Sequence, residues 1–366
     1  MRKGRTPVLL MSHALGAGGG ERQLALTALG MKRYQAHVAA VQGGHWVKPL
    51  EDAGVPLYWV RSRSLLSFDA LREGRRLSQY LGSQNIALVH SFDYTMNLFG
   101  MPVAACTRGV IPVAAQRCEM GLVPPRYRRP TVWAHKMSGQ VVVNSSRLRD
   151  ELVQDFGERA DRISVCYNGV DTAMFTGSPA ERIPVSETQG ASLVIACVCV
   201  LRPEKNLALL IEAFRKVQQP GWRLLLVGDG PERQALIAQA SGLDCVFVPS
   251  TNEVFRYLRA AHIFVLASRS EGLSNSIMEA MASGCAVAAT RVGGNPELVE
   301  HGQTGLLFEN ASLEGLTAAL QRLADPAERH RLAEAGQRRM RNDFSLESAV
   351  ERIEALYDRL LLEPRS

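Results

Sequence analysis

The chain has 366 residues, of which 46% are hydrophobic and 21% are charged. This composition is ordinary for a soluble globular protein, and the length excludes a single core of typical size, which favours two domains. The net charge of +6 comes from the first half, because residues 1–171 contain 22 Lys and Arg against 13 Asp and Glu, whereas the remainder contains 20 against 23. Such a basic half suits either an ordinary solvated surface or a face turned toward anionic lipid or a phosphorylated acceptor.

Cysteine usage and hydropathy bear on the compartment. Seven cysteines occur without a C-x-x-C pair, and several lie in apolar runs such as VIACVCV, which contains Cys197 and Cys199. This predicts buried, reduced thiols in a cytoplasmic chain. The apolar run near the N-terminus is short, and no run of about 18 apolar residues occurs, so we expect neither export nor a transmembrane helix. Any membrane contact would be peripheral, at the inner face.

Short apolar runs alternate with longer segments of helical period, which is typical of βα units and parallel sheets. The predicted strands are PVLLMS, HVAAV, PLYWV, LVHS, PVAAQ, VVVNS, SVCYNG, LVIACVCV, RLLLVG, CVFVP, IFVLAS, CAVAAT and GLLF. A polar stretch over 172–191 predicts a linker. We therefore expect one domain over 1–172, a second over 173–345, and a last amphipathic helix within 346–366 that crosses back to the first domain and packs across both.

The first strand is followed by HALGAGGGERQLALTAL, a glycine loop before a helix that starts near Glu21. The dinucleotide fingerprint G-x-G-x-x-G fails here, because its third glycine would fall at Glu21 when counted from Gly16, or at Gln23 when counted from Gly18. A nicotinamide enzyme is therefore disfavoured. The three glycines at 18–20 either let a ligand approach a helix N-terminus closely or form a tight turn only.

His90 follows the apolar run IALV and so lies at the carboxyl end of a strand, where open α/β sheets bind ligands. Two interpretations stay open for it. It is either a structural histidine or a hydrogen-bond donor or acceptor for a sugar hydroxyl.

A segment rich in basic and aromatic residues spans 117–136. It contains Arg117, Arg126, Tyr127, Arg128, Arg129, Trp133 and Lys136. Such a mixture suits a membrane surface, a polyanion or a phosphate-bearing acceptor, and a merely solvated loop is the alternative. No recognised nucleic-acid motif accompanies the segment, so we do not expect nucleic acid as a partner.

In the second half, Arg202 and Lys205 follow the strand LVIACVCV. Two cations three residues apart at the end of a strand suit a diphosphate, by direct pairing and by stabilising it as it leaves.

The stretch over 268–297 reads SRSEGLSNSIMEAMASGCAVAATRVGGNPE. Glu271 lies in the loop before a predicted helix and Glu279 lies on that helix, so the two carboxylates address different parts of an extended ligand. Backbone N–H groups of Leu273, Ser274 and Asn275 at the helix start form an anion site. A phosphate flanked by two carboxylates indicates an activated sugar.

Together these motifs resemble the retaining GT-B glycosyltransferases of the family 4 type. The resemblance rests on GGGER, the strand end at His90, YNGVD, LRPEKN, VGDGPER and SEGLSNSIMEAMASGCAVAATRVGGNPELV. It implies an α/β fold of two Rossmann-like domains facing a central cleft. It also implies a metal-independent hexosyltransferase without a cofactor, since the nucleotide sugar is a substrate.

The resemblance further implies a role for each matching residue. Glu271 would contact the donor sugar, Glu279 the nucleotide ribose, and Gly272 would help to bind the donor. Leu273, Ser274 and Asn275 would hold the diphosphate, which Lys205 and Arg202 would stabilise on departure. Gly18, Gly19 and His90 would meet the donor from the first domain, and Arg117 and Glu119 would face the acceptor. The chain departs from the common pattern G-R-L-x-P-E-K, because Cys199 and Val200 occupy the positions of its glycine and arginine.

We therefore predict transfer of a sugar from a UDP- or GDP-linked donor to a hydroxyl of a saccharide or lipid-linked acceptor, with retention of configuration. Such a reaction serves cell-surface polysaccharide or glycolipid synthesis. The alternatives are a nucleotide-sugar epimerase on the same fold, which needs acid and base groups at the sugar ring, and a binding module without turnover.

Overall fold

The computed structural model describes residues 5–16, 18–61, 68–178 and 182–362. These residues form two compact units, one of residues up to 169 together with those from 346 onward, and one of residues 170–345. The boundary lies three residues before the predicted one at 172/173. Part of the predicted linker, 179–181, lies outside the described residues, and the rest of it belongs to the second unit.

In the first unit, seven parallel strands form a sheet of order β3-β2-β1-β4-β5-β6-β7 within the described residues. Each predicted apolar run forms one strand, since strands buried on both faces are apolar throughout. The strands are β1 Thr6–Ala14, β2 Tyr34–Gln42, β3 Leu57–Trp59, β4 Leu88–Ser91, β5 Ile111–Gln116, β6 Gln140–Val143 and β7 Ile163–Val165. The helices are α1 Gly19–Gly30, α2 Val47–Asp52, α3 Phe68–Ser83, α4 Tyr94–Cys106, α5 Pro125–Met137, α6 Ser146–Phe156 and α14 Leu346–Leu362.

The described part of the second unit contains a parallel sheet of order β10-β9-β8-β11-β12-β13. Its strands are β8 Leu193–Val198, β9 Trp222–Val227, β10 Cys245–Val248, β11 Ile263–Leu266, β12 Ala286–Thr290 and β13 Leu306–Phe308. Its helices are α7 Leu207–Val217, α8 Arg233–Gln239, α9 Val254–Ala260, α10 Asn275–Ala282, α11 Asn295–Leu298, α12 Leu313–Ala324 and α13 Pro326–Asp343.

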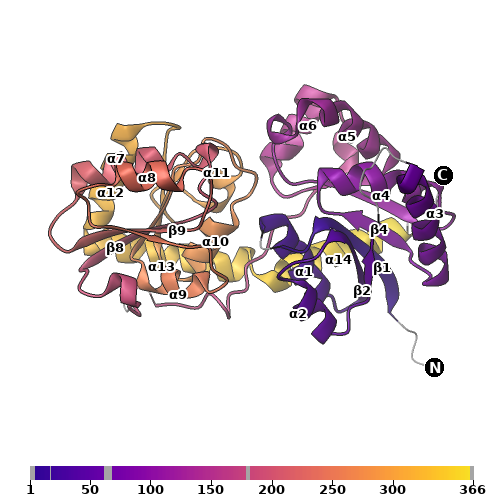
Figure 1. The fold of residues 1–366 in the computed structure, drawn as a ribbon, viewed down its shortest axis with the longest axis horizontal. Coiled ribbons are helices and arrows are strands. Elements are labelled where there is room, and N and C mark those ends of the chain that lie inside the picture. The colour runs from indigo at the N-terminus through magenta and orange to yellow at the C-terminus, as the bar shows by residue number, and fades with distance from the viewer. Residues whose placement is uncertain (1–4, 17, 62–67, 179–181, 363–366) are drawn as a thin grey trace. The chain divides into compact units, whose positions relative to one another are not determined.

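Helices cover both faces of each sheet, so each unit has the three layers of a Rossmann-like fold (Figure 1). The predicted α/β class with two such units is confirmed. Strand order reverses between β1 and β4 in the first sheet and between β8 and β11 in the second. Open α/β sheets bind ligands beyond the carboxyl ends of the strands at such reversals.

The predicted last helix is α14, which lies with α1 and β1 of the first unit, yellow against indigo in Figure 1. Its apolar face, including Ile353 and Tyr357, joins the core cluster of that unit. The Tyr357 ring packs edge-on against Tyr34 of β2, with ring centroids 5.4 Å apart. Burial of this face therefore binds the end of the chain to the first sheet.

Glu354 of α14 is a buried carboxylate that anchors this helix. One of its oxygens accepts from the backbone N–H groups of Lys32 and Arg33 at 2.8 and 2.7 Å, and the other accepts from Arg33 Nε at 3.1 Å. Glu354→Gln is expected to lower the free energy of unfolding by about 1–3 kcal/mol, because an amide cannot accept all three bonds. Urea unfolding measures this, and Glu351→Gln on the exposed face is the control. Equal midpoints for the two variants would refute the anchoring role.

His262, just before β11, is expected to make the stability of the second unit depend on pH. Its Nδ1 accepts from Val194 N–H at 3.1 Å, and burial, with the nearby charges of Arg182 and Arg329, lowers its pKa from 6.5 to about 4. The folded state favours the neutral His262 ring over the protonated one. The contribution of His262 to the free energy of unfolding is therefore fully present above about pH 6.5 and is lost as the pH falls toward about 4. His262→Gln is expected to flatten the thermal midpoint over this range. An unchanged slope relative to His330→Gln would contradict the assignment.

Candidate functional site

Two loops meet where the second sheet reverses its strand order. One follows β8 and contains the 3₁₀ turn Pro203–Lys205, and the other follows β11 and leads into α10. Arg269 N–H of the second loop donates to the Glu204 carbonyl of the first at 2.8 Å. The loops are therefore held side by side although they lie far apart in the sequence.

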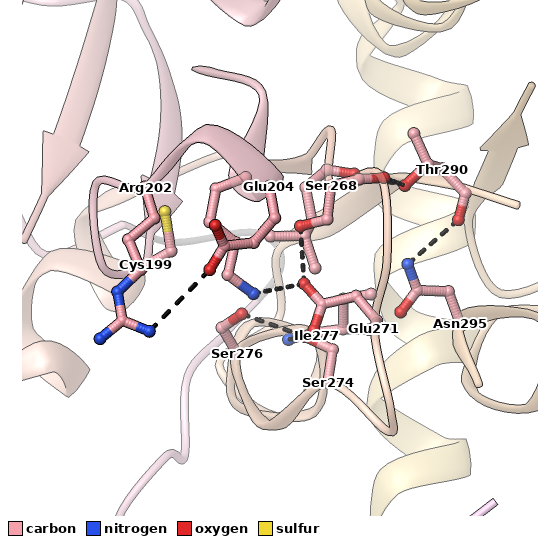
Figure 2. Close-up of polar contacts among 12 residues, drawn as sticks. Cys199, Arg202, Glu204, Ser268, Glu271, Ser274, Ser276, Ile277, Thr290 and Asn295 are labelled. Carbon is pink, nitrogen blue, oxygen red and sulfur yellow. Dashed lines mark hydrogen bonds and ion pairs between the residues drawn. The ribbon is translucent and has the colours of Figure 1, made fainter. Parts of the chain in front are cut away.

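Lys205 and Glu271 form an ion pair between these loops (Figure 2). Lys205 Nζ donates to Glu271 Oε1 at 2.6 Å, and Ser268 Oγ donates to the same oxygen at 2.6 Å. Both side chains are largely shielded, with 21% of Lys205 and 11% of Glu271 exposed. Burial opposes the charge on Lys205, but the adjacent Glu271 carboxylate outweighs it, and the pKa of the Lys205 ammonium is raised. The site therefore presents a fixed cation.

Residues of β12 and of the turn that follows it hold the Glu271 loop in place through hydrogen bonds and packing. Thr290 Oγ1 donates to the Ser268 carbonyl at 2.6 Å, and Asn295 Nδ2 donates to the Thr290 carbonyl at 3.0 Å. Gly293 has a φ of +51°, and a Cβ at this position would lie 1.9 Å from the Glu271 carbonyl oxygen. The glycine turn thus packs directly on the backbone of Glu271.

The helix that follows this loop begins as the sequence predicts. Ser274 is the N-cap of α10, and its Oγ accepts from Ile277 N–H at 3.3 Å. Gly272 and Leu273 lie in the loop, Asn275 opens the helix, and Glu279 lies on its second turn with 5% exposure. The positive end of the helix dipole therefore adjoins the Lys205–Glu271 pair.

Arg202 does not join this pair. Its side chain is 60% exposed, and its NH1 lies 3.9 Å from Glu204 Oε1. Figure 2 shows its guanidinium directed away from Glu271. The structure thus does not bring Arg202 to the Lys205–Glu271 pair. The role of Arg202 at a diphosphate stays a prediction.

In the first unit, Gly18 is the N-cap of α1 and Gly19 is the first helical residue, two residues before the predicted start at Glu21. A Cβ on Gly18 would lie 1.9 Å from Glu21 Oε2, so this carboxylate folds back over the glycine. Burial, reinforced by Asp93, raises the pKa of Glu21. The chain's own carboxylate therefore lies over this helix N-terminus.

His90 is buried with 0% exposure and lies next to the last residue of β4, at the carboxyl end of the strand as predicted. Its Nδ1 lies 2.7 Å from the Tyr357 hydroxyl, because the side chain faces α14. Burial and the Arg117 charge lower the pKa of His90 well below its usual value, so the ring is neutral. These contacts support the structural interpretation of His90, and its contact with a sugar hydroxyl stays a prediction.

Arg117 and Glu119 follow β5. Arg117 NH1 donates to Asn168 Oδ1 at 2.8 Å, and its guanidinium carbon lies 4.2 Å from the centre of the Phe92 ring. Burial lowers the pKa of Arg117 to about 10. Glu119 immediately precedes the 3₁₀ turn Met120–Leu122. Their predicted roles toward an acceptor stay predictions.

Sequence reasoning missed the residues that hold Glu271 in place. Ser268, Thr290 and Asn295 carry no charge, and only the strand order brings them together. The hydroxyl three residues before Glu271 and the glycine turn after β12 were the available signals.

The described residues contain neither a cluster of metal-binding side chains nor a helix that could span a membrane. They contain no group of three or more His, Cys, Asp or Glu side chains that could hold a metal ion. No helix among them is sufficiently long and apolar to cross a bilayer.

Each half of the chain matches a different family model. Residues 192–325 match the model described as glycosyl transferases group 1, and residues 17–174 match that of glycosyltransferase family 4.

Curated relatives share a part of their length with this chain. The Arabidopsis thaliana sulfoquinovosyl transferase SQD2 is 26% identical over 254 residues, covering 64% of this chain and 49% of the relative. A D-inositol 3-phosphate glycosyltransferase of Pseudarthrobacter chlorophenolicus is 30% identical over 264 residues, covering 67% and 62%. The chain spans about half the length of the first curated relatives that it matches.

Solved structures extend the similarity to the whole fold. HepE of Anabaena in complex with UDP and glucose superimposes with a TM-score of 0.84 at 20% identity, covering 96% of this chain and 99% of that one. The fold is therefore GT-B, as predicted.

Proposed function

Because the chain belongs to the group 1 glycosyltransferases of the family 4 type, we propose that it transfers a hexosyl group from a nucleoside-diphosphate sugar to an acceptor hydroxyl with retention. The observation that carries this proposal is the shielded ion pair of Lys205 and Glu271 beside the N-terminus of α10. A fixed cation and a helix dipole at one strand-order reversal suit a diphosphate leaving group.

In the proposed mechanism, the acceptor hydroxyl attacks from the face that the leaving diphosphate occupies, through an oxocarbenium-like transition state. The diphosphate takes the acceptor proton, so no carboxylate acts as the nucleophile. Lys205 and the N–H groups of Leu273, Ser274 and Asn275 stabilise the negative charge as it develops. Glu271 orients Lys205 and accepts from sugar hydroxyls, and Glu279 accepts from the ribose. These roles require no metal ion.

UDP is the nucleotide that we propose for the donor, with GDP as the alternative. HepE, the structural relative that holds UDP and glucose, supports this choice. The proposed acceptor is a saccharide or lipid-linked saccharide in cell-surface polysaccharide or glycolipid synthesis.

Incubation with labelled UDP- and GDP-sugars and candidate saccharide acceptors tests the proposal. Transfer with retention, or slow hydrolysis of the donor, would support it, and NMR of the anomeric proton reports the configuration. Interconversion of the sugar alone would indicate an epimerase instead, and binding without turnover would indicate a binding module. Full activity in EDTA is the expected result for a reaction without metal.

The outer face of α5 supports a membrane location for a lipid-linked acceptor. This helix contains no acidic residue, and Arg126, Arg129 and Lys136 are exposed on it together with Trp133, which is 56% exposed. Basic side chains with an exposed indole suit an anionic lipid surface. We therefore propose peripheral binding to the cytoplasmic leaflet.

Changing Arg126, Arg129 and Lys136 together to Gln is expected to weaken binding to anionic vesicles about 100-fold, since each basic residue near such a surface contributes about 1 kcal/mol. Cosedimentation with phosphatidylserine-containing vesicles measures this. The control replaces Arg338 and Arg341, which are exposed on α13. Equal loss in both variants would show a general charge effect and contradict a role of α5.

A further inference from the structure

Two thiols lie next to each other at the end of β8. Cys197 is on the strand with 2% exposure. Cys199, the first residue after the strand, is partly exposed. Their sulfur atoms are 3.8 Å apart. Side chains alternate between the two faces along a strand, and Cys199 directly follows the last strand residue, Val198, so its sulfur lies on the same side as that of Cys197.

This pair adjoins the proposed donor site. Cys199 begins the loop that leads to Lys205, and Figure 2 shows its sulfur near the turn that carries Glu204. The hydrogen bond to Cys199 and burial raise the pKa of Cys197, and the charges of Lys205 and Glu271 are close enough to act on it. The buried thiol is therefore protonated, and the partly exposed Cys199 is the one that a reagent reaches.

We propose that Cys197 and Cys199 form a modification site at which a peroxide converts the two thiols into a disulfide and thereby weakens donor binding. Cys199 sulfur attacks one peroxide oxygen, the O–O bond breaks, and a sulfenic acid and water form. Cys197 sulfur then attacks the Cys199 sulfur, its proton leaves with the hydroxyl as a second water, and the S–S bond forms. Two thiols are oxidised and one peroxide is reduced to two waters.

Closure requires the backbone at Cys199 to move. The sulfur atoms must approach from 3.8 Å to about 2.05 Å, and Cα atoms two residues apart in an extended chain lie near the upper limit that a disulfide spans. β8 ends at Val198, so Cys199 is not held by a strand on both sides. We therefore expect the backbone to change conformation at Cys199 when the disulfide forms, whereas β8 keeps its conformation.

This movement reaches the donor loops through backbone contacts. Cys199 N–H donates to the Val227 carbonyl at 3.1 Å. A Cβ on Gly228 would lie only 1.9 Å from the Cys199 carbonyl oxygen. Displacing Cys199 is therefore expected to disturb both the turn at Gly228, which follows β9, and the loop that positions Lys205.

The test has two separate readouts, because the effect on the donor rests on the proposed function and the disulfide does not. The full chain is treated with hydrogen peroxide and its intact mass is followed, with peptide mapping of the product. The expected product lacks two hydrogen atoms, links Cys197 to Cys199 and is reversed by dithiothreitol. Cys199→Ser is expected to lose this product, and Cys106→Ser, at an exposed thiol of the first unit, is expected to retain it.

UDP affinity, measured by calorimetry before and after oxidation, is the second readout. A fall of about tenfold or more in wild type, absent in Cys199→Ser and restored by dithiothreitol, is the expected result. Stable sulfinic acid in place of the disulfide overturns the proposal, and so does a disulfide that leaves UDP affinity unchanged. If the reduced protein binds neither UDP nor GDP, the proposed function fails, whereas the mass readout still decides the disulfide.

Discussion

Lys205→Ala is expected to lower turnover at least about 100-fold, as does the loss of one preorganised donor to a developing negative charge elsewhere. Lys205 is the cation that the structure fixes at the α10 N-terminus, because Glu271 Oε1 holds its Nζ at 2.6 Å. Exposed Arg202 is 3.9 Å from Glu204 and cannot substitute without moving. The effect should fall on kcat more than on KM, since the charge develops in the transition state.

Release of the nucleoside diphosphate at saturating donor measures this loss. Lys216→Ala, on the exposed face of α7, is the matched control and is expected to retain wild-type turnover. Circular dichroism must show that the Lys205 variant is folded, because the change leaves the shielded Glu271 carboxylate without its cation. Near-normal turnover in a folded Lys205→Ala protein would refute the assigned role.

Gly293→Ala is expected to reduce both stability and donor affinity strongly. The residue has a φ of +51°, which costs an alanine roughly 1 kcal/mol, and the added Cβ would meet the Glu271 carbonyl oxygen at 1.9 Å. That oxygen belongs to backbone, so the overlap forces the Glu271 loop to move rather than a flexible side chain. We therefore expect donor affinity to fall at least about tenfold, since site geometry tolerates displacements of only about 0.5 Å.

Gly302→Ala separates the two causes. This glycine has a φ of +76°, but a Cβ there would meet only the end of the Arg322 side chain, at 3.9 Å. The control therefore carries the conformational cost without the collision. Thermal unfolding and UDP calorimetry on both variants measure the difference. If Gly302→Ala loses as much UDP affinity as Gly293→Ala, the collision with Glu271 is not the cause.

The strands could be predicted from the sequence because their burial leaves little ambiguity. β12, Ala286–Thr290, is buried at every residue, and a parallel strand covered on both faces reads as one apolar run between turns. The start of α10 could also be predicted from the sequence, since serine, as at Ser274, is a common N-cap residue. These features depend on local chemistry alone.

The ion pair of Lys205 with Glu271 could not be predicted in the same way. The residues are 66 positions apart, and only the adjacency of β8 and β11 brings their loops together. The surroundings of His90 could not be predicted for a related reason, because a fully buried strand has no polar alternation that shows which face a side chain takes. The group that fills the space beside it is Tyr357, 267 positions later.

The place of α14 has a consequence for the order in which the chain folds during synthesis. Residues 170–345 form one continuous unit, whereas the first unit consists of two segments that flank it. The second unit can complete its core as soon as residue 345 has left the ribosome. The first unit was begun earlier but must wait for Tyr357 and its neighbours on α14, although domains made first generally fold first. A ribosome that stops short of α14 therefore releases a nascent chain with a finished second unit and an open first core.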